Sequence, residues 1–327
     1  MMNFFSGALP DAIGQGVLWS MMVLGVYITF RILDVADLTV DGSFSFGGCT
    51  CAAFLYNGYN PWFALLMGFV AGFSAGVVTG ILHTAFDIPA ILAGILTQIS
   101  LWPINLQVMG SANTSLIRAK EGGRIETLFI KVSEFSGKIS PDLELDSKEA
   151  PILVGIIVAI VVIFFMYWFF GTEFGSAIRA TGDNENMIKA LGVNTKVTKL
   201  IALAFSNGLV GLSGALVAQS QKYGDINMGT GAIVIGLAAI VIGEVLLGWL
   251  KSFKGKLFAV IVGSIVYFVI RAVALEFDID PSYMKLISAV IVALALAVPK
   301  FIEDFRNKRL YTPDDVEDTD STGKEEA

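Results

Sequence analysis

Long apolar stretches alternate with polar segments along most of the chain. Six of them are long enough to cross the ~30 Å hydrocarbon core of a bilayer as α-helices: residues 12–30, 62–82, 89–109, 151–171, 200–219 and 230–250. A shorter stretch, 42–56, is followed by a turn-forming sequence rich in Asn, Gly and Pro. Two more, 257–275 and 283–299, contain Arg271 and Lys285, whose stems can reach a membrane interface. The pattern predicts about nine transmembrane helices, with eight or ten as alternatives.

Composition agrees with a membrane protein. Of the 327 residues, 55% are hydrophobic and 16% are charged, against ~45–50% and ~25% in soluble domains. Helices must form the spans, because backbone polar groups in lipid need internal partners and the apolar stretches are too continuous for barrel strands. We therefore predict an all-α fold, a polytopic membrane helical bundle over residues 1–302. An acidic cytoplasmic tail, 303–327, is expected to be disordered.

Lysine and arginine gather in three polar segments: 251–256, 173–199 and the residues after 305. Nine spans would place all three on one side, and cytoplasmic loops carry an excess of Lys and Arg. This predicts that the N-terminus lies outside and the C-terminus inside. Loop 110–150 is then external and loop 173–199 is cytoplasmic.

Loop 173–199 carries the capping and apolar residues of a short helix, so it is more than an irregular connection between two spans. Asp183 or Asn184 can cap a short helix, and Gly192 suits its C-terminal end. The apolar edge of that helix would consist of Met187, Ile188 and Leu191. We predict a short amphipathic helix over 184–191, and an ordinary surface or interfacial helix would carry the same pattern.

Polar residues inside the predicted spans are candidates for a substrate path, because such residues tend to face the bundle interior or an aqueous cavity. Asp41 precedes a short span rich in Gly and Ser, of the kind that often lines such a path. We expect it to cap the helix beginning at Gly42 or Ser43, and a cap at the cytoplasmic interface is the simpler interpretation. The candidates are Asp41, Ser43, Ser45, Gln98, Asn105 and Asn207.

Glycines recur at every fourth position of the 62–82 span and would form a smooth ridge for close helix packing. They are Gly68, Gly72, Gly76 and Gly80. No catalytic or metal site is predicted, because the sequence has one histidine, His83, and no HExxH motif. Cys49 and Cys51 lie in an apolar stretch typical of buried thiols. No basic stripe suggests nucleic acid.

Two of these segments resemble a known family. The sequences LTVDGSFSFGG, residues 38–48, and GSAIRATGDNENMIKALGV, residues 175–193, are similar to segments of the permeases of branched-chain amino acid and ribose type ABC importers. Within that family the chain is most like the subgroup of tryptophan/tyrosine-type permeases. The resemblance covers roughly 12–300. Loop 110–150 is longer than expected for the family, and the acidic tail is a second departure.

The resemblance implies that loop 173–199 holds a coupling helix, which sits in a cleft of an ATPase subunit. The family's pattern falls on Arg179, Ala180, Gly182, Asn184, Ala190, Gly192 and Val193. Together with the predicted helix, the expected coupling residues are Arg179, Gly182, Asp183, Asn184, Met187, Ile188, Leu191 and Gly192.

The resemblance also implies partners. It implies a second permease copy, most simply in a homodimer, two ATPase subunits that bind ATP and Mg²⁺, and an extracytoplasmic solute-binding protein or lipoprotein. The assembly would lie in the lipid of the bacterial cytoplasmic membrane. The sequence contains no Walker A motif, G-x-x-x-x-G-K-[ST], so ATP hydrolysis would be supplied by the partner and no cofactor is expected on this chain.

The predicted function is therefore an importer permease for a small solute, an amino acid first of all, with aromatic ones favoured through the subgroup. A self-contained secondary transporter is the alternative. It would need membrane-embedded carboxylates or broken helices, and Glu244 and Asp41 are the candidates. An intramembrane enzyme is a third class, and the single histidine and the lack of an HExxH motif count against it.

Overall fold

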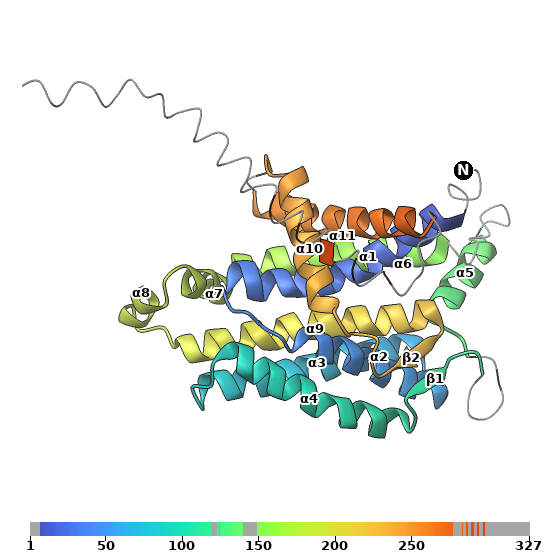
Figure 1. Ribbon diagram of the computed structural model, residues 1–327, viewed down its shortest axis with the longest axis horizontal. Coiled ribbons are helices and arrows are strands. Elements are labelled where there is room, and N and C mark those ends of the chain that lie inside the picture. Colours follow the sequence, from blue (N-terminus) through green and yellow to red (C-terminus); the bar gives the residue numbers. More distant parts are fainter. Residues whose placement is uncertain are drawn as a thin grey trace, which may run out of the picture.

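The computed structural model shows that the protein is a bundle of long helices (Figure 1). The structure describes residues 7–118, 123, 125–139, 149–250 and 252–276, with single positions between 283 and 297. Its helices are α1 (Leu9–Tyr27), the π-helical turn η2 (Ile28–Ile32), α2 (Val40–Tyr56), α3 (Pro61–Thr84), α4 (Ala90–Met109), α5 (Leu128–Ile139), α6 (Glu149–Gly171), α7 (Glu173–Asp183), α8 (Glu185–Ala190), α9 (Thr195–Gln221), α10 (Ala232–Leu246) and α11 (Phe253–Glu276). Two short strands, β1 (Asn113–Ser115) and β2 (Tyr223–Asp225), pair antiparallel.

The all-helical prediction is confirmed, and a helix lies at each of the first eight predicted spans. Six helices of the described residues are long and apolar enough to cross a membrane: α1 with η2, α3, α4, α6, α9 and α11. α2 and α10 are shorter. The ninth predicted span, 283–299, and the tail lie outside the continuously described residues. α7 and α8 project at one end of the bundle, and β1 and β2 lie at the other (Figure 1).

Two helices form the centre of the bundle. α1 with η2 and α9 are the most buried of the long helices, because 83% and 78% of their most apolar stretches lie inside the protein. Ser206 Oγ donates to the Gly25 carbonyl at 2.7 Å, and Ser213 Oγ donates to the Leu18 carbonyl at 2.8 Å. Because the partner numbers fall along α1 as they rise along α9, the two helices run antiparallel.

Small residues let the outer helices approach this centre. A Cβ added to Gly72 or Gly76 of α3 would overlap the backbone of α9, at Asn207 and Leu203, and one added to Gly68 would come within 2.6 Å of Ala215. Gly80 faces Leu200 on the same helix. The glycine ridge of α3 therefore lies on α9, and its lack of side chains sets the distance between the two helices.

The arrangement of α1, α2 and α3 recurs in the second half of the chain. α10 begins 192 residues after α2, at Ala232 and Val40, and α11 begins and ends 192 residues after α3. α3 packs on α9 while α11 packs on α1, where Ser264 Oγ donates to the Gly16 carbonyl. Since α1 and α9 are antiparallel, the two halves form an inverted repeat, a plan common among transporters.

The connection between η2 and α2 turns back into the bundle. By the α1–α9 pairing, Ile32 lies near the level of residue 199, but Asp37 bonds to Asn207. The chain thus climbs back about eight residues of α9, or ~12 Å at 1.5 Å per residue. In the second half, α10 begins inside the bundle as well, and a Cβ at Gly236 would contact Val26 and Met22 at 3.1–3.2 Å.

The glycine ridge gives a direct test. Gly72→Ala should lower the free energy of unfolding by ~1–3 kcal/mol, because the new methyl group overlaps the α9 backbone and the helices must separate. Gly171→Ala is the matched control, since its Cβ would meet nothing within 4 Å. Thermal unfolding in detergent measures both. Equal melting temperatures for the two variants would show that α3 and α9 are not in this close contact.

Candidate functional site

A cavity of about 430 Å³ lies between α2, α4 and the loop before α10. Its lining is mixed, with amide, hydroxyl and carboxylate groups beside apolar side chains. Four of the six candidates for a substrate path line it: Asp41, Ser45, Gln98 and Asn105. The other lining residues are Gly42, Ile99, Trp102, Pro103, Ile226, Asn227 and Thr230. The structure therefore brings together residues from three segments that are far apart in sequence.

Asp41 joins two helix starts at this cavity. It lies in the first turn of α2, and its carboxylate accepts hydrogen bonds from the backbone amides of Gly231, at 2.8 Å, and Ile233, at 2.9 Å. The prediction that Asp41 caps its own helix is wrong, because α2 already includes Asp41 and its carboxylate caps α10 instead. A negative side chain at the N-terminus of α10 also suits the helix dipole.

Ser45 reinforces the same junction. Its hydroxyl accepts a hydrogen bond from the Gly229 amide at 2.9 Å and donates to the Asp41 carbonyl at 3.2 Å. A Cβ at Gly229 would overlap that carbonyl, so the loop can approach α2 this closely only with glycine there. The loop before α10 is thus fixed to the first turns of α2 at three positions.

Ser43 and Asn207 lie in a buried network instead of lining the cavity. Ser43 Oγ donates to Asn207 Oδ1 at 2.7 Å, and Asn207 Nδ2 donates to Asp37 Oδ2 at 2.6 Å. The other Asp37 oxygen accepts from the Thr39 amide at 2.9 Å. Sequence reasoning missed Asp37, which is only 3% exposed. The signal was present in the Asp-x-Thr spacing, a common local turn in which Asp accepts from the amide two residues on.

Polar groups at the cavity are available for hydrogen bonds to a ligand. Asn105 is 1% exposed, and its Oδ1 has no hydrogen-bond partner among the described residues. Gln98 is half-buried about two turns earlier on α4, and Trp102 Nε1 donates to Asn227 Oδ1 at 3.4 Å. Buried polar atoms are normally satisfied. These groups can therefore take up a small polar solute that presents donors to the amides and an apolar part to Trp102.

The second candidate segment is the α7–α8 pair. Asn184 caps α8 by accepting from the Met187 amide at 3.0 Å, and Gly192 has a φ of +84° just after the helix. Both agree with the predicted helix, which the structure makes slightly shorter, Glu185–Ala190. The preceding helix α7 was not predicted. Thr172 caps it by accepting from the Gly175 amide at 3.2 Å.

The apolar side chains of α8 divide between two faces. Ile188 is 5% exposed and packs inward, whereas Met187 and Leu191 are 53% and 70% exposed. Residues four apart lie on the same face of a helix. Met187 and Leu191 therefore form an unpartnered apolar knob at the tip of the molecule, next to the exposed Asp183 and Asn184.

Gly182 and Arg179 attach α7 to the bundle. A Cβ at Gly182 would overlap the Ile32 carbonyl, so α7 rests directly on η2. Gly182 thus lies within α7 and is a packing contact. The Arg179 guanidinium lies over the Phe253 ring, 5.7 Å from its centroid, at the start of α11.

Glu185 attaches α8 to α9. Its carboxylate pairs with Lys199 at 2.7 Å and with Lys189 at 2.9 Å, and it accepts from Thr195 Oγ1 at 3.2 Å. The hydrogen bond from Lys199, followed by the one from Lys189, lowers the pKa of Glu185 from 4.5 to about 2. α7 and α8 are therefore linked to both central helices, through η2 and through the start of α9.

Replacing Asp41 tests the junction at the cavity. Asp41→Ala leaves the Gly231 and Ile233 amides without an acceptor and should cost ~1–2 kcal/mol of stability, the usual cost of losing a helix cap. Asp41→Asn keeps one acceptor oxygen and should recover most of it. Thermal unfolding compares the three proteins. An Asp41→Ala protein as stable as the parent would contradict the assignment.

The lowered pKa of Glu185 predicts how the attachment of α8 depends on pH. A carboxylate with a depressed folded-state pKa stabilises the fold above its ordinary pKa, here 4.5, and that contribution is lost as the pH falls toward about 2. A spin label at Asn186 should therefore keep the same mobility from pH 8 to pH 5 and become more mobile below about 4.5. Glu185→Gln should be mobile already at pH 7. Unchanged mobility in that variant would remove the anchoring role.

Known proteins resemble this chain over most of its length. The family described as "Branched-chain amino acid transport system / permease component" matches residues 9–296. The tyrosine transport system permease protein of Clostridioides difficile is 37% identical over 283 residues, which cover 86% of this chain and 88% of that protein. The uncharacterized protein RP368 of Rickettsia prowazekii is 30% identical over 89% of this chain and 98% of its own length.

A more distant relative is a permease of another kind. The autoinducer 2 import system permease protein LsrC of Escherichia coli is 28% identical over 72% of this chain and 68% of its own length. No solved structure gives a significant match.

Proposed function

This chain belongs to the permease components of branched-chain amino acid type transport systems, and from that premise we propose that it carries an amino acid through the membrane. It is a multi-pass protein of the bacterial cytoplasmic membrane and the permease subunit of an ABC importer, a family in which the permease component does not itself hydrolyse ATP. The proposal rests on the cavity at the α2–α10 junction and on the exposed apolar knob of Met187 and Leu191 at the α7–α8 end of the bundle.

An aromatic amino acid is the proposed substrate. The support is the 37% identity to a protein named for tyrosine transport. The cavity agrees with it, because amide groups for polar contacts lie beside the indole of Trp102. The relative named for autoinducer 2 import is less similar and favours a different solute. The proposed path runs past Asp41, Ser45, Gln98 and Asn105, with Ser43 and Asn207 bracing α2 behind it.

The proposed assembly is a homodimer of this chain on two ATPase subunits, which bind ATP and Mg²⁺, with an extracytoplasmic solute-binding protein on the opposite side. Nine spans, the N-terminus outside and the C-terminus inside follow from the Lys and Arg distribution. The external segment 110–150, which includes α5, would then face the binding protein, and mixed charge suits a transient, salt-sensitive contact.

Coupling is proposed to pass through α7 and α8. Closure of the ATPase subunits would press on the knob of Met187 and Leu191. Glu185 would pass the motion to α9, and Gly182 would pass it to η2 and the end of α1. Both central helices would then move together. A rigid segment held at two points can transmit force in this way, whereas a loop without fixed contacts cannot.

The coupling proposal predicts the effect of Met187→Asp. The variant should fold and insert normally, since Met187 is 53% exposed. It should nevertheless release the ATPase and stop ATP-dependent uptake, because a charge at the interface would be buried without a partner. Loss of a buried side chain of this size alone typically costs ~1–3 kcal/mol of binding. Pull-down of the ATPase and uptake by whole cells measure the two effects.

Lys196→Gln is the matched control for that experiment. Lys196 lies near the same end, has a side chain that is 57% exposed, and forms a surface ion pair with Asp87 at 3.4 Å. This variant should keep both the ATPase and transport. A Met187→Asp protein that still purified with a stoichiometric ATPase and transported normally would show that α8 is not the coupling element, and the secondary transporter would return as the better explanation.

The proposed orientation predicts a labelling pattern. Cys49 and Cys51 are both buried, so alanine at these positions gives a background for single cysteines. An impermeant maleimide on intact cells should modify cysteine at Glu126 and spare cysteine at Lys189, until the cells are opened. Labelling of Lys189→Cys alone in intact cells would reverse the topology.

A further inference from the structure

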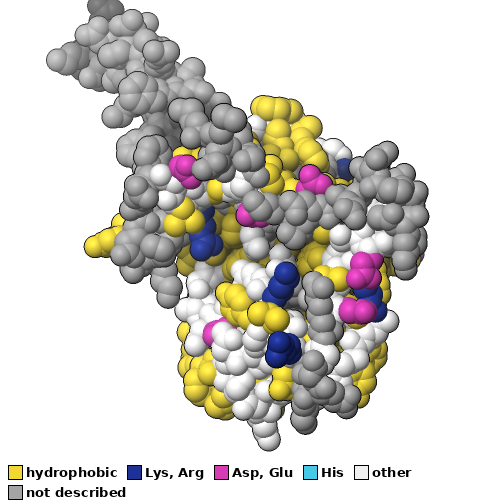
Figure 2. Space-filling view, turned by 90° about the vertical axis from the view of Figure 1, so that its right-hand side faces the viewer, with side chains coloured by type: hydrophobic (Ala, Val, Ile, Leu, Met, Phe, Trp, Pro, Cys, Tyr) yellow, Lys and Arg dark blue, Asp and Glu magenta, His cyan; other side chains and the backbone are white. Residues whose placement is uncertain are grey.

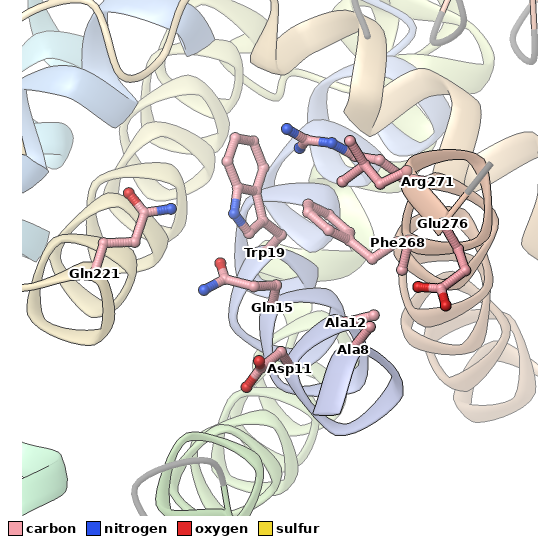
Figure 3. Close-up of a pocket in the computed structure, with 11 residues that line it drawn as sticks. Ala8, Asp11, Ala12, Gln15, Trp19, Gln221, Phe268, Arg271 and Glu276 are labelled. Atoms are coloured by element: carbon pink, nitrogen blue, oxygen red, sulfur yellow. The ribbon is translucent and has the colours of Figure 1, made fainter. Parts of the chain in front are cut away.

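A second cavity, of about 440 Å³, opens at the end of the bundle opposite α8. α1 contributes Asp11, Gln15 and Trp19, and α11 contributes Phe268, Arg271 and Glu276. Gln221, Ala8, Ala12, Ala272 and Leu275 complete the lining. In Figure 3 the Arg271 guanidinium lies above the rings of Trp19 and Phe268, and the polar ends of Gln15, Asp11 and Glu276 lie below them. Figure 2 shows basic and acidic side chains together on this end of the molecule.

The inner wall of this cavity is aromatic. Trp19 is 7% exposed and Phe268 is 5% exposed, and their ring centroids are 5.4 Å apart. Trp19 also contacts Phe44 of α2, with centroids 4.5 Å apart. The aromatic wall is thus held rigidly by its neighbours, and it separates this cavity from the helix that lines the first one.

The charged groups of the cavity are of both signs. No carboxylate in the described part of the chain lies within ion-pair distance of Arg271, whose guanidinium lies 5.8 Å from the centroid of the Phe268 ring. Asp11 of α1 supplies one carboxylate, and Glu276, on α11 like Arg271, supplies another. Gln15 adds an acceptor, because its Oε1 is buried and has no hydrogen-bond partner among the described residues.

We propose that this cavity is an entry subsite for an aromatic amino acid in its zwitterionic form. The substrate carboxylate would bind Arg271, whose planar guanidinium suits a carboxylate. The ammonium group would lie between Asp11 or Glu276 and Gln15 Oε1, and the side chain would lie against Trp19 and Phe268. A cation, two carboxylates, a free acceptor and an aromatic wall match each part of such a molecule. The volume falls in the range of small-molecule sites, ~300–1,000 Å³.

This inference rests on the proposed function for its choice of an amino acid. Its place in transport follows from geometry, because the cavity lies at the end that would face the binding protein under the proposed orientation. Trp19 packs on Phe44, which lies in the first turns of α2 beside Ser43 and Ser45. A solute bound here is therefore one helix away from the cavity at Asp41.

Equilibrium binding of tritiated L-tyrosine to the permease in nanodiscs tests the subsite without ATPase or binding protein. Binding should be saturable, and tyramine, which lacks the carboxylate, should compete poorly. Arg271→Gln should weaken binding by about tenfold or more, as expected for loss of a charge-assisted hydrogen bond. Arg271→Lys should recover part of it. Lys222→Gln, a neighbouring exposed cation outside the lining, is the matched control and should bind normally.

Phosphatidylethanolamine carries a similar pair of charges, so the nanodiscs are prepared both with and without it. If tyrosine shows no saturable binding even in nanodiscs without phosphatidylethanolamine, and this lipid binds the cavity instead, the cavity would be assigned to a lipid headgroup. Equal binding by the parent and Arg271→Gln, or absence of saturable binding, would also overturn the proposal. ATP-dependent tyrosine uptake by the complete complex distinguishes failure of the subsite from failure of the proposed function. Uptake without binding at this cavity rejects only the subsite, whereas absence of uptake rejects the proposed function.

Discussion

Where a helix begins inside a membrane protein, its free backbone amides must find hydrogen-bond partners in the protein, because lipid offers none. This constraint decides what happens where α2 and α10 begin within the bundle. Asp41 accepts from two amides of α10, and Asp37 accepts from the start of α2 while holding Asn207. Two carboxylates therefore stabilise the two interior helix starts that border the cavity beside Asp41.

The inverted repeat extends this constraint to the whole bundle. α1 and α9 lie antiparallel at its centre, and each carries the glycine or serine contacts of a helix from the other half. Each interior helix start also contacts a central helix, at Asn207 of α9 and at Val26 of α1. The α7–α8 segment touches η2 through Gly182 and α9 through Glu185. Its contacts reach both central helices, which is the property that a coupling element needs.

Hydropathy predicted the helices well and their connections poorly. Helices were found at eight of the predicted spans, because long apolar stretches indicate helices buried in lipid. The pattern contains no information on direction, so a loop that climbs ~12 Å back into the bundle looked like an ordinary connector. The partner of Asp41 is 190 residues away, and local capping rules can assign such a carboxylate only to its own helix. Asn184 and Gly192 were predicted correctly because their roles depend on neighbours within a few residues.

The central claim is that this chain moves an amino acid only as part of an ATP-driven complex. Uptake of labelled L-tyrosine into proteoliposomes tests it most directly, with the permease reconstituted alone, with an ATPase subunit, and with the ATPase and a solute-binding protein. The account predicts uptake only when all three proteins and ATP are present. Uptake by the permease alone, driven by a proton or sodium gradient, would contradict it and identify a secondary transporter.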